Sequence, residues 1–169
     1  LKFLQEWATP LTVANFFLLG TASGFTLAGV FASIFAPALT GLYAWAAMAL
    51  TMAAAATRIA SLVRNARLHP RSSMQSAIRI AHPQIAQRSR GFTGGSFNTR
   101  EFFHGRSPAF MSGVKWTFLL LAFAAPAVLL LAGQPALAFV VQLAGLVAER
   151  WYFFAEARHP QNLYYQAVS

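Results

Sequence analysis

Four long apolar runs follow one another along the chain, and the polar residues gather in one stretch between the second and the third run. The runs cover about residues 11–34, 39–59, 108–131 and 135–155. A helix rising about 1.5 Å per residue needs roughly 20 apolar residues to cross about 30 Å of hydrocarbon. The pattern therefore predicts an all-α, polytopic membrane bundle with four transmembrane helices.

The ends of these runs divide the chain into two hairpins. Thr9-Pro10 and Ser107-Pro108 each place a capping residue before a proline at the first helical position. The connections at 35–38 and 132–134 are short and uncharged. We therefore expect a first transmembrane hairpin over residues 1–60, a loop over 61–107, and a second hairpin with a tail over 108–169.

Composition supports a membrane location. Of the 169 residues, 57% are apolar and only 10% are charged, whereas soluble domains carry about 25% charged residues. The absence of cysteine excludes disulfides, Cys-ligated zinc and an iron–sulfur cluster held by this chain alone. Because the sequence starts at Leu1 without an initiator methionine or a signal-peptide pattern, we expect it to be part of a longer polypeptide.

The loop carries most of the net charge. Its eight arginines face one acid, Glu101, which gives +7 of the chain's net +9. The positive-inside rule predicts that this loop is cytoplasmic, and four spans then place both ends of the sequence on the same side. We interpret the arginines as a topology signal and a docking surface rather than a nucleic-acid site, because they are spread over nearly the whole loop.

Ionisable residues within the spans are the candidates for function, because a charge at bilayer depth is costly and usually faces the bundle interior. Glu149, Tyr152, Phe153 and Glu156 share one helix face, and Arg150 is expected to point about 100° away from it. Two interpretations stay open. In the structural one, Glu149 pairs with Arg58 or Lys115, and Trp151 and Tyr152 join an interfacial aromatic belt.

In the functional interpretation, this charged layer borders a quinone headgroup. A carboxylate would exchange the protons of quinone chemistry, and Tyr, Trp or a cation would hydrogen-bond a carbonyl oxygen. The candidate quinone-binding residues are Arg58, Lys115, Glu149, Arg150, Trp151, Tyr152 and Glu156.

Two further patterns carry less chemistry. His69, His82, His104 and His159 all lie in the loop or beyond the last span, so we expect neither bis-histidine haem nor a metal site on this chain. Gly20, Gly24 and Ala28 form a small-residue stripe along which another helix can approach closely. That helix belongs either to this bundle, which we favour, or to a part of the protein outside this sequence.

Three strings resemble a known family: IAHPQI at 80–85, GFTGGSFNTREFFHG at 91–105 and ERWYFFAEARH at 149–159. They are similar to the membrane anchor subunits of dimethyl sulfoxide reductase type molybdoenzymes, which include the membrane subunit of sulfite dehydrogenase. That family has eight spans, and this chain resembles the last four. The resemblance implies an anchor that holds an iron–sulfur subunit and a molybdopterin subunit and exchanges electrons with quinone.

The basic loop favours one branch of that family. A loop that docks a partner faces the partner's side, so a cytoplasmic loop points to the sulfite-oxidising, quinone-reducing complex of a bacterial inner membrane. The alternative is the anchor of an exported dimethyl sulfoxide reductase type enzyme, in which an acidic partner holds the loop outside. For docking we favour Arg100, Glu101, Phe102 and His104, although the aromatic residues could instead fold the loop onto the bundle.

A transporter half is a different class of explanation. The charged layer would then line a solute path, and transporters often have helices broken near the midplane. Pro126 is the one proline in the middle of a predicted span. Since a single proline can merely kink a helix, this interpretation is the weaker one.

Overall fold

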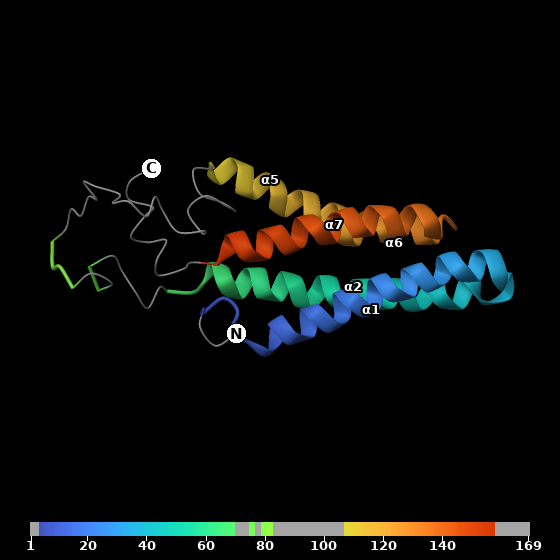
Figure 1. The fold of residues 1–169 in the computed structure, drawn as a ribbon, viewed down its shortest axis with the longest axis horizontal. Helices are drawn as coiled ribbons and strands as arrows, with labels where there is room; N and C mark the ends of the chain where they lie inside the picture. The colour runs from blue at the N-terminus through green and yellow to red at the C-terminus, as the bar shows by residue number, and fades with distance from the viewer. Residues whose placement is uncertain (1–3, 70–74, 77–78, 83–106, 158–169) are drawn as a thin grey trace, which may run out of the picture.

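The computed structural model describes residues 4–69, 75–76, 79–82 and 107–157, and every regular element in these ranges is helical. Within these ranges, four helical spans are long and apolar enough to cross a membrane. This result confirms the predicted all-α bundle. Figure 1 shows the spans lying lengthwise beside one another.

The first hairpin consists of α1 (Pro10–Phe35) and α2 (Thr40–Ala66), joined by the short 3-10 helix η1 (Pro37–Leu39). The extended residue Thr9 caps α1, because its hydroxyl accepts a hydrogen bond from the Leu11 amide at 3.4 Å. The predicted start of the first span is therefore confirmed.

α2 is longer than the predicted second span, which ended at residue 59. The helix continues to Ala66, so the first residues assigned to the loop are helical. Hydropathy marks where the apolar run stops, but arginine is a good helix former and extends the same helix past that point. The predicted boundary between hairpin and loop at residues 60–61 therefore falls within a helix.

The third span is built from three consecutive segments: α5 (Pro108–Leu119), the π-helical turn η2 (Leu120–Ala124) and α6 (Ala125–Leu131). Ser107 caps its start, since its hydroxyl accepts a hydrogen bond from the Phe110 amide at 3.2 Å. Pro126 lies two residues after the π turn, at the second position of α6. Because proline has no N–H to donate to the preceding turn, the wider π turn accommodates it without ending the span.

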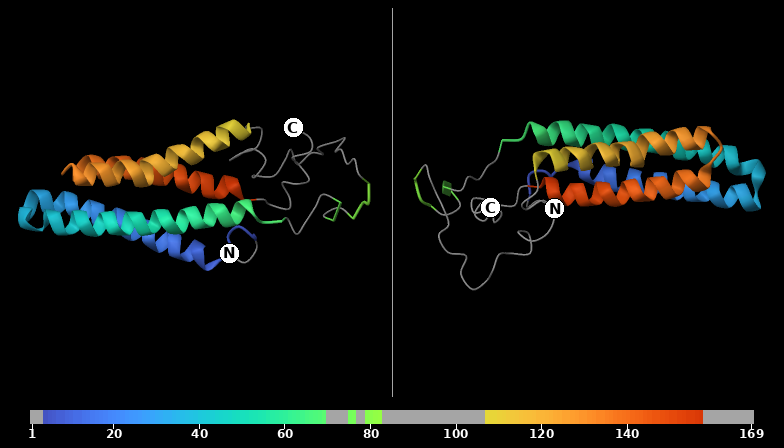
Figure 2. Two further views of the ribbon diagram at one scale, coloured as in Figure 1. Left: turned by 180° about the vertical axis from the view of Figure 1, so that it is seen from behind. Right: turned by 90° about the horizontal axis from the view of Figure 1, so that it is seen from above.

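The last span is α7 (Pro135–Glu156). The turn before it contains Gly133 at a φ of +69°, a left-handed conformation that glycine adopts without strain. Figures 1 and 2 show that α1 and α5 begin at the same end of the bundle where α2 and α7 finish. This end adjoins the basic stretch of the sequence, and we call it the basic end.

The helices form a four-sided bundle. α1 packs along α2 and also contacts α7, whereas the third span packs between α7 and α2. α2 and α7 therefore lie diagonally across the bundle, and side chains that join them cross its centre. Both helices run toward the basic end (Figure 2).

α7 approaches the third span closely at Gly145. A methyl group added there would lie 2.7 Å from the Cα of Ala122 and closer still to other backbone atoms of Leu121 and Ala122. Only glycine lets α7 pack this tightly against the π turn.

The small-residue stripe on α1 faces away from the other described helices at Gly20 and Gly24. Gly20 and Gly24 are exposed, and within the described part of the chain no atom lies within 4 Å of a methyl group added at either position. The expectation that this stripe packs within the bundle is therefore wrong, because the buried face of α1 is the one that carries Asn15, Leu19 and Ala22.

Candidate functional site, a buried charge cluster

A buried ion pair links α2 to α7 across the bundle centre. Arg58 Nε lies 2.7 Å from Glu149 Oε1, and the two side chains are 2% and 0% exposed. A pair this deeply buried is tolerated only when the charges compensate each other closely, because desolvation of each ion is costly. The prediction that Glu149 forms an ion pair between helices is confirmed. Its partner is Arg58 and not Lys115.

Two more charges complete the cluster. Arg150 forms an ion pair with the second carboxylate oxygen of Glu149, and Glu156 lies 3.6 Å from Arg58 Nη2. The expectation that Arg150 points away from this face is wrong, because its long side chain turns back to the neighbouring carboxylate. These ion pairs of the described residues thus join two arginines and two glutamates, whose formal charges cancel.

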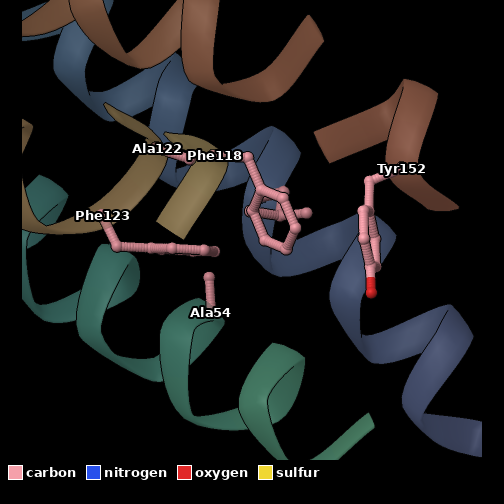
Figure 3. Packing of buried hydrophobic residues seen from close by; sticks show 6 residues of the cluster. Ala54, Phe118, Ala122, Phe123 and Tyr152 are labelled. Carbon is pink, nitrogen blue, oxygen red and sulfur yellow. The ribbon is translucent and has the colours of Figure 1, made fainter. Parts of the chain in front are cut away.

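Aromatic rings surround both arginines. The guanidinium of Arg58 lies 5.5 Å from the ring centre of Phe118 and 5.9 Å from that of Tyr152, and Arg150 lies 4.1 Å from the ring centre of Phe16. Figure 3 shows Phe118 and Tyr152 side by side, with Phe123 extending toward Ala54 of α2. Cation–π contacts of this kind stabilise desolvated guanidinium groups.

Tyr152 is therefore part of the core. Its side chain is 8% exposed and packs against Phe118 with ring centres 5.2 Å apart. The predicted place of Tyr152 in an interfacial belt is wrong, since its helix face is the one that carries Glu149 and points inward. Trp151 is half-buried and packs edge-on against Phe110.

The ion pair between Arg58 and Glu149 is one of two buried polar pairs that join α2 to α7, and the other one was not predicted from the sequence. Gln142 of α7 donates a hydrogen bond to Thr51 of α2 at 3.2 Å, and both side chains are buried. Thr51 and Arg58 are seven residues apart, as are Gln142 and Glu149. Because seven residues make nearly two helical turns, the two pairs repeat along the same faces. This matched spacing is the signal that could have revealed them.

A third polar pair lies between α1 and α2. The side-chain amide of Asn15 donates a hydrogen bond to the hydroxyl of Ser61 at 2.8 Å. Some buried oxygens near these pairs accept no hydrogen bond from the described residues, among them Asn15 Oδ1, Gln142 Oε1 and Glu149 Oε1. The contact between Arg58 and Glu149 is likewise a close ion pair rather than an aligned hydrogen bond.

The residues before α1 fold over the basic end of the cluster. The Trp7 ring stacks on Phe153 with centres 5.1 Å apart, and its indole N–H donates a hydrogen bond to the Phe153 carbonyl at 3.3 Å. Leu4 is only 3% exposed. Sequence reasoning missed this contact, and no local pattern predicts it, because the two residues are 146 positions apart.

The other predicted site residues lie apart from the cluster or outside the described residues. Lys115 is half-buried and lies 5.8 Å from the ring centre of Trp116, its chain neighbour. His69 and His82 are exposed, and the described ranges contain no group of side chains that could hold a metal ion. Most of the loop lies outside the described residues, and so do these predicted residues: Arg100, Glu101, Phe102, His104 and His159.

A known protein is similar to almost the whole chain. A sulfite dehydrogenase subunit of Allochromatium vinosum is 51% identical to it over 175 residues, which cover 99% of this chain and 54% of the relative. The chain therefore spans about half the length of the curated relative that it matches. No family model and no solved structure matches the chain. Over nearly its whole length, this chain is similar to part of a sulfite dehydrogenase subunit.

Proposed function

We propose that this chain is part of the membrane anchor subunit of a sulfite-oxidising complex and that it contributes to the exchange of electrons with quinone. The observation that carries the proposal is the 51% identity to the sulfite dehydrogenase subunit of Allochromatium vinosum over 99% of the chain. In this proposal an iron–sulfur subunit and a molybdopterin subunit dock on the membrane part, and the chain corresponds to the last four of about eight spans.

The overall reaction balances without a further reactant. Sulfite and water give sulfate, two protons and two electrons, and quinone takes up two electrons and two protons to give quinol. The oxidation of sulfite belongs to the partner subunits. The part assigned to the anchor is to bind the quinone near the end of the electron path and to supply the protons.

The buried cluster suggests different roles for its two carboxylates. Glu149 is held by Arg58 and Arg150 and is 0% exposed, so we assign it the positioning of the two arginines. Glu156 is 16% exposed, and its 3.6 Å contact with Arg58 is looser. A carboxylate that exchanges protons needs access to water, so Glu156 is the better candidate for that role. All the candidate quinone-binding residues stay predictions: Arg58, Lys115, Glu149, Arg150, Trp151, Tyr152 and Glu156.

We infer the orientation of the chain in the membrane from the charge of its basic stretch. The +7 of residues 60–107 favours the cytoplasmic side for the basic end and for the docked subunits in a bacterial inner membrane. An exported dimethyl sulfoxide reductase type complex would reverse this orientation. The two complexes also differ in substrate and in the direction of electron flow, so activity distinguishes them.

The first experiment purifies the native complex in mild detergent, identifies the chains that co-purify, and measures quinone reduction by sulfite beside dimethyl sulfoxide reduction by quinol. We expect sulfite-dependent quinone reduction with iron–sulfur and molybdenum subunits present. Dimethyl sulfoxide reduction alone would favour the exported branch. A protein that purifies alone and transports a solute would overturn the proposal.

Two variants test the assigned residues. Glu156→Gln should slow quinone reduction while leaving sulfite oxidation by a soluble electron acceptor unchanged, and Glu156→Asp should restore part of the rate. Arg100→Glu should release the hydrophilic subunits from the membrane, whereas Arg79→Glu, another arginine of the same stretch, should release less. Full membrane-bound activity in Arg100→Glu would show that the dock lies elsewhere.

A further inference from the structure

A shallow open pocket of about 690 Å³ lies along the outer face of α2, near the basic end. Its floor is apolar and includes Ala56, Ile59, Ala60 and Val63, and its end carries Arg64 and Arg67. These positions recur every three or four residues, so they form one stripe on the helix. The stripe lies opposite the buried face that carries Thr51, Arg58 and Ser61.

The dimensions of this stripe match one leaflet of a membrane. From Ala56 to Arg67 the helix advances by roughly 16 Å at about 1.5 Å per residue, and half of the hydrocarbon core is about 15 Å thick. The small side chains of Ala56 and Ala60 leave room between the larger Ile59 and Val63, which are 49% and 47% exposed. An acyl chain can therefore lie along the floor of the pocket.

The two arginines at its end are not neutralised within the described part of the chain. Arg64 donates hydrogen bonds to the Gln5 carbonyl at 3.1 Å and to Asn65 Oδ1 at 3.0 Å, both uncharged acceptors. The ion pairs of the described residues involve Arg58 and Arg150 and include neither Arg64 nor Arg67. Two cations one helical turn apart make a site for a phosphate, which guanidinium groups bind through paired hydrogen bonds.

We propose that this pocket binds an anionic phospholipid, with the phosphate at Arg64 and Arg67 and an acyl chain along the apolar stripe. The apolar floor favours a lipid over free phosphate, and the uncompensated charge favours an anionic headgroup over a zwitterionic one. This site is separate from the ion-pair cluster, and the proposal does not depend on quinone chemistry or on sulfite oxidation.

The test uses the full-length protein in its purified, delipidated complex and measures binding of dioleoylphosphatidylglycerol and dioleoylphosphatidylcholine by native mass spectrometry. The double variant Arg64→Gln/Arg67→Gln should weaken phosphatidylglycerol binding roughly thirtyfold. Ala60→Phe should weaken it too, because the ring fills the floor while the charge is kept. Arg79→Gln, which removes an exposed arginine outside the pocket, should bind like the wild type.

Three results would overturn the proposal. Equal binding of the two lipids would remove the headgroup argument, and wild-type affinity in both the arginine double variant and Ala60→Phe would remove the site. A photocrosslinker at Val63 that captures another protein segment instead of lipid would show that protein covers this face. Each result leaves the sulfite and quinone assays unaffected, so the failure of this inference is distinct from that of the proposed function.

Discussion

Arg58 of α2 and Glu149 of α7 lie 2.7 Å apart, 91 residues distant in the sequence and enclosed by the same four-helix bundle. Their helices are diagonal to each other, so the pair crosses the centre of the bundle. The pair lies in the half of the bundle nearer the basic end, since Arg58 is eight residues before the end of α2 and Glu156, the last residue of α7, lies 3.6 Å from Arg58 Nη2. The pair therefore joins the two hairpins through their buried faces.

The substitution Glu149→Gln is expected to lower the stability of the bundle strongly. Removing one partner leaves the buried guanidinium of Arg58 without its closest counter-charge, a change that typically costs about 3–5 kcal/mol. Thermal unfolding of the detergent-solubilised complex should show a clearly lower Tm. The double variant Arg58→Met/Glu149→Leu removes both fully buried charges and should regain part of the loss, the remainder being due to Arg150, which still loses its carboxylate partner. A wild-type Tm in Glu149→Gln would contradict the pairing.

Gly145→Ala should separate α7 from the π turn of the third span. The added methyl group has no room beside Ala122, and overpacking of this kind costs about 1–3 kcal/mol. The matched control is Gly113→Ala, because the described residues leave open space around that position. Unfolding curves of the two variants should differ, with only Gly145→Ala shifted to lower temperature. Equal stability of the two variants would argue against the close approach.

The hydrogen bond between Gln142 and Thr51 should make only a modest contribution to the stability of the bundle. Interhelical hydrogen bonds in membranes have an average coupling energy of about 0.6 kcal/mol, because the separated helices also find partners. A double-mutant cycle of Gln142→Leu and Thr51→Val measures this coupling, and we expect a positive value below about 2 kcal/mol. A coupling of zero would show that the two side chains act independently.

The predicted orientation can be measured with single cysteines, since this sequence contains none. His69 lies just beyond α2 at the basic end, and Ala132 lies in the turn at the opposite end, both exposed. In inside-out membrane vesicles, a membrane-impermeant maleimide should label His69→Cys and not Ala132→Cys. Right-side-out vesicles should give the reverse. Labelling of Ala132→Cys in the inside-out vesicles would place the basic end outside the cytoplasm.

The sequence alone determined the four spans and their starts. Apolar runs of the required length predict membrane helices because hydrocarbon leaves the backbone no other hydrogen-bond partners. Thr9-Pro10 and Ser107-Pro108 predict where helices begin because capping acts between residues close in the chain. The inward face of Glu149, Tyr152 and Phe153 was also predictable, since helical periodicity is local. The helical extension to Ala66 was not, because the apolar run ends earlier.

Only the tertiary structure decided which charges meet. Arg58 and Lys115 were equally reasonable partners for Glu149 in the sequence, and the diagonal placement of α2 and α7 selects Arg58. The return of Arg150 to Glu149, the contact of Trp7 with Phe153 and the burial of Gly145 against Ala122 likewise depend on how the two hairpins dock. Periodicity fixes the face on which a side chain lies, but its partner depends on the rotation and height of a neighbouring helix, which are set by packing over the whole bundle.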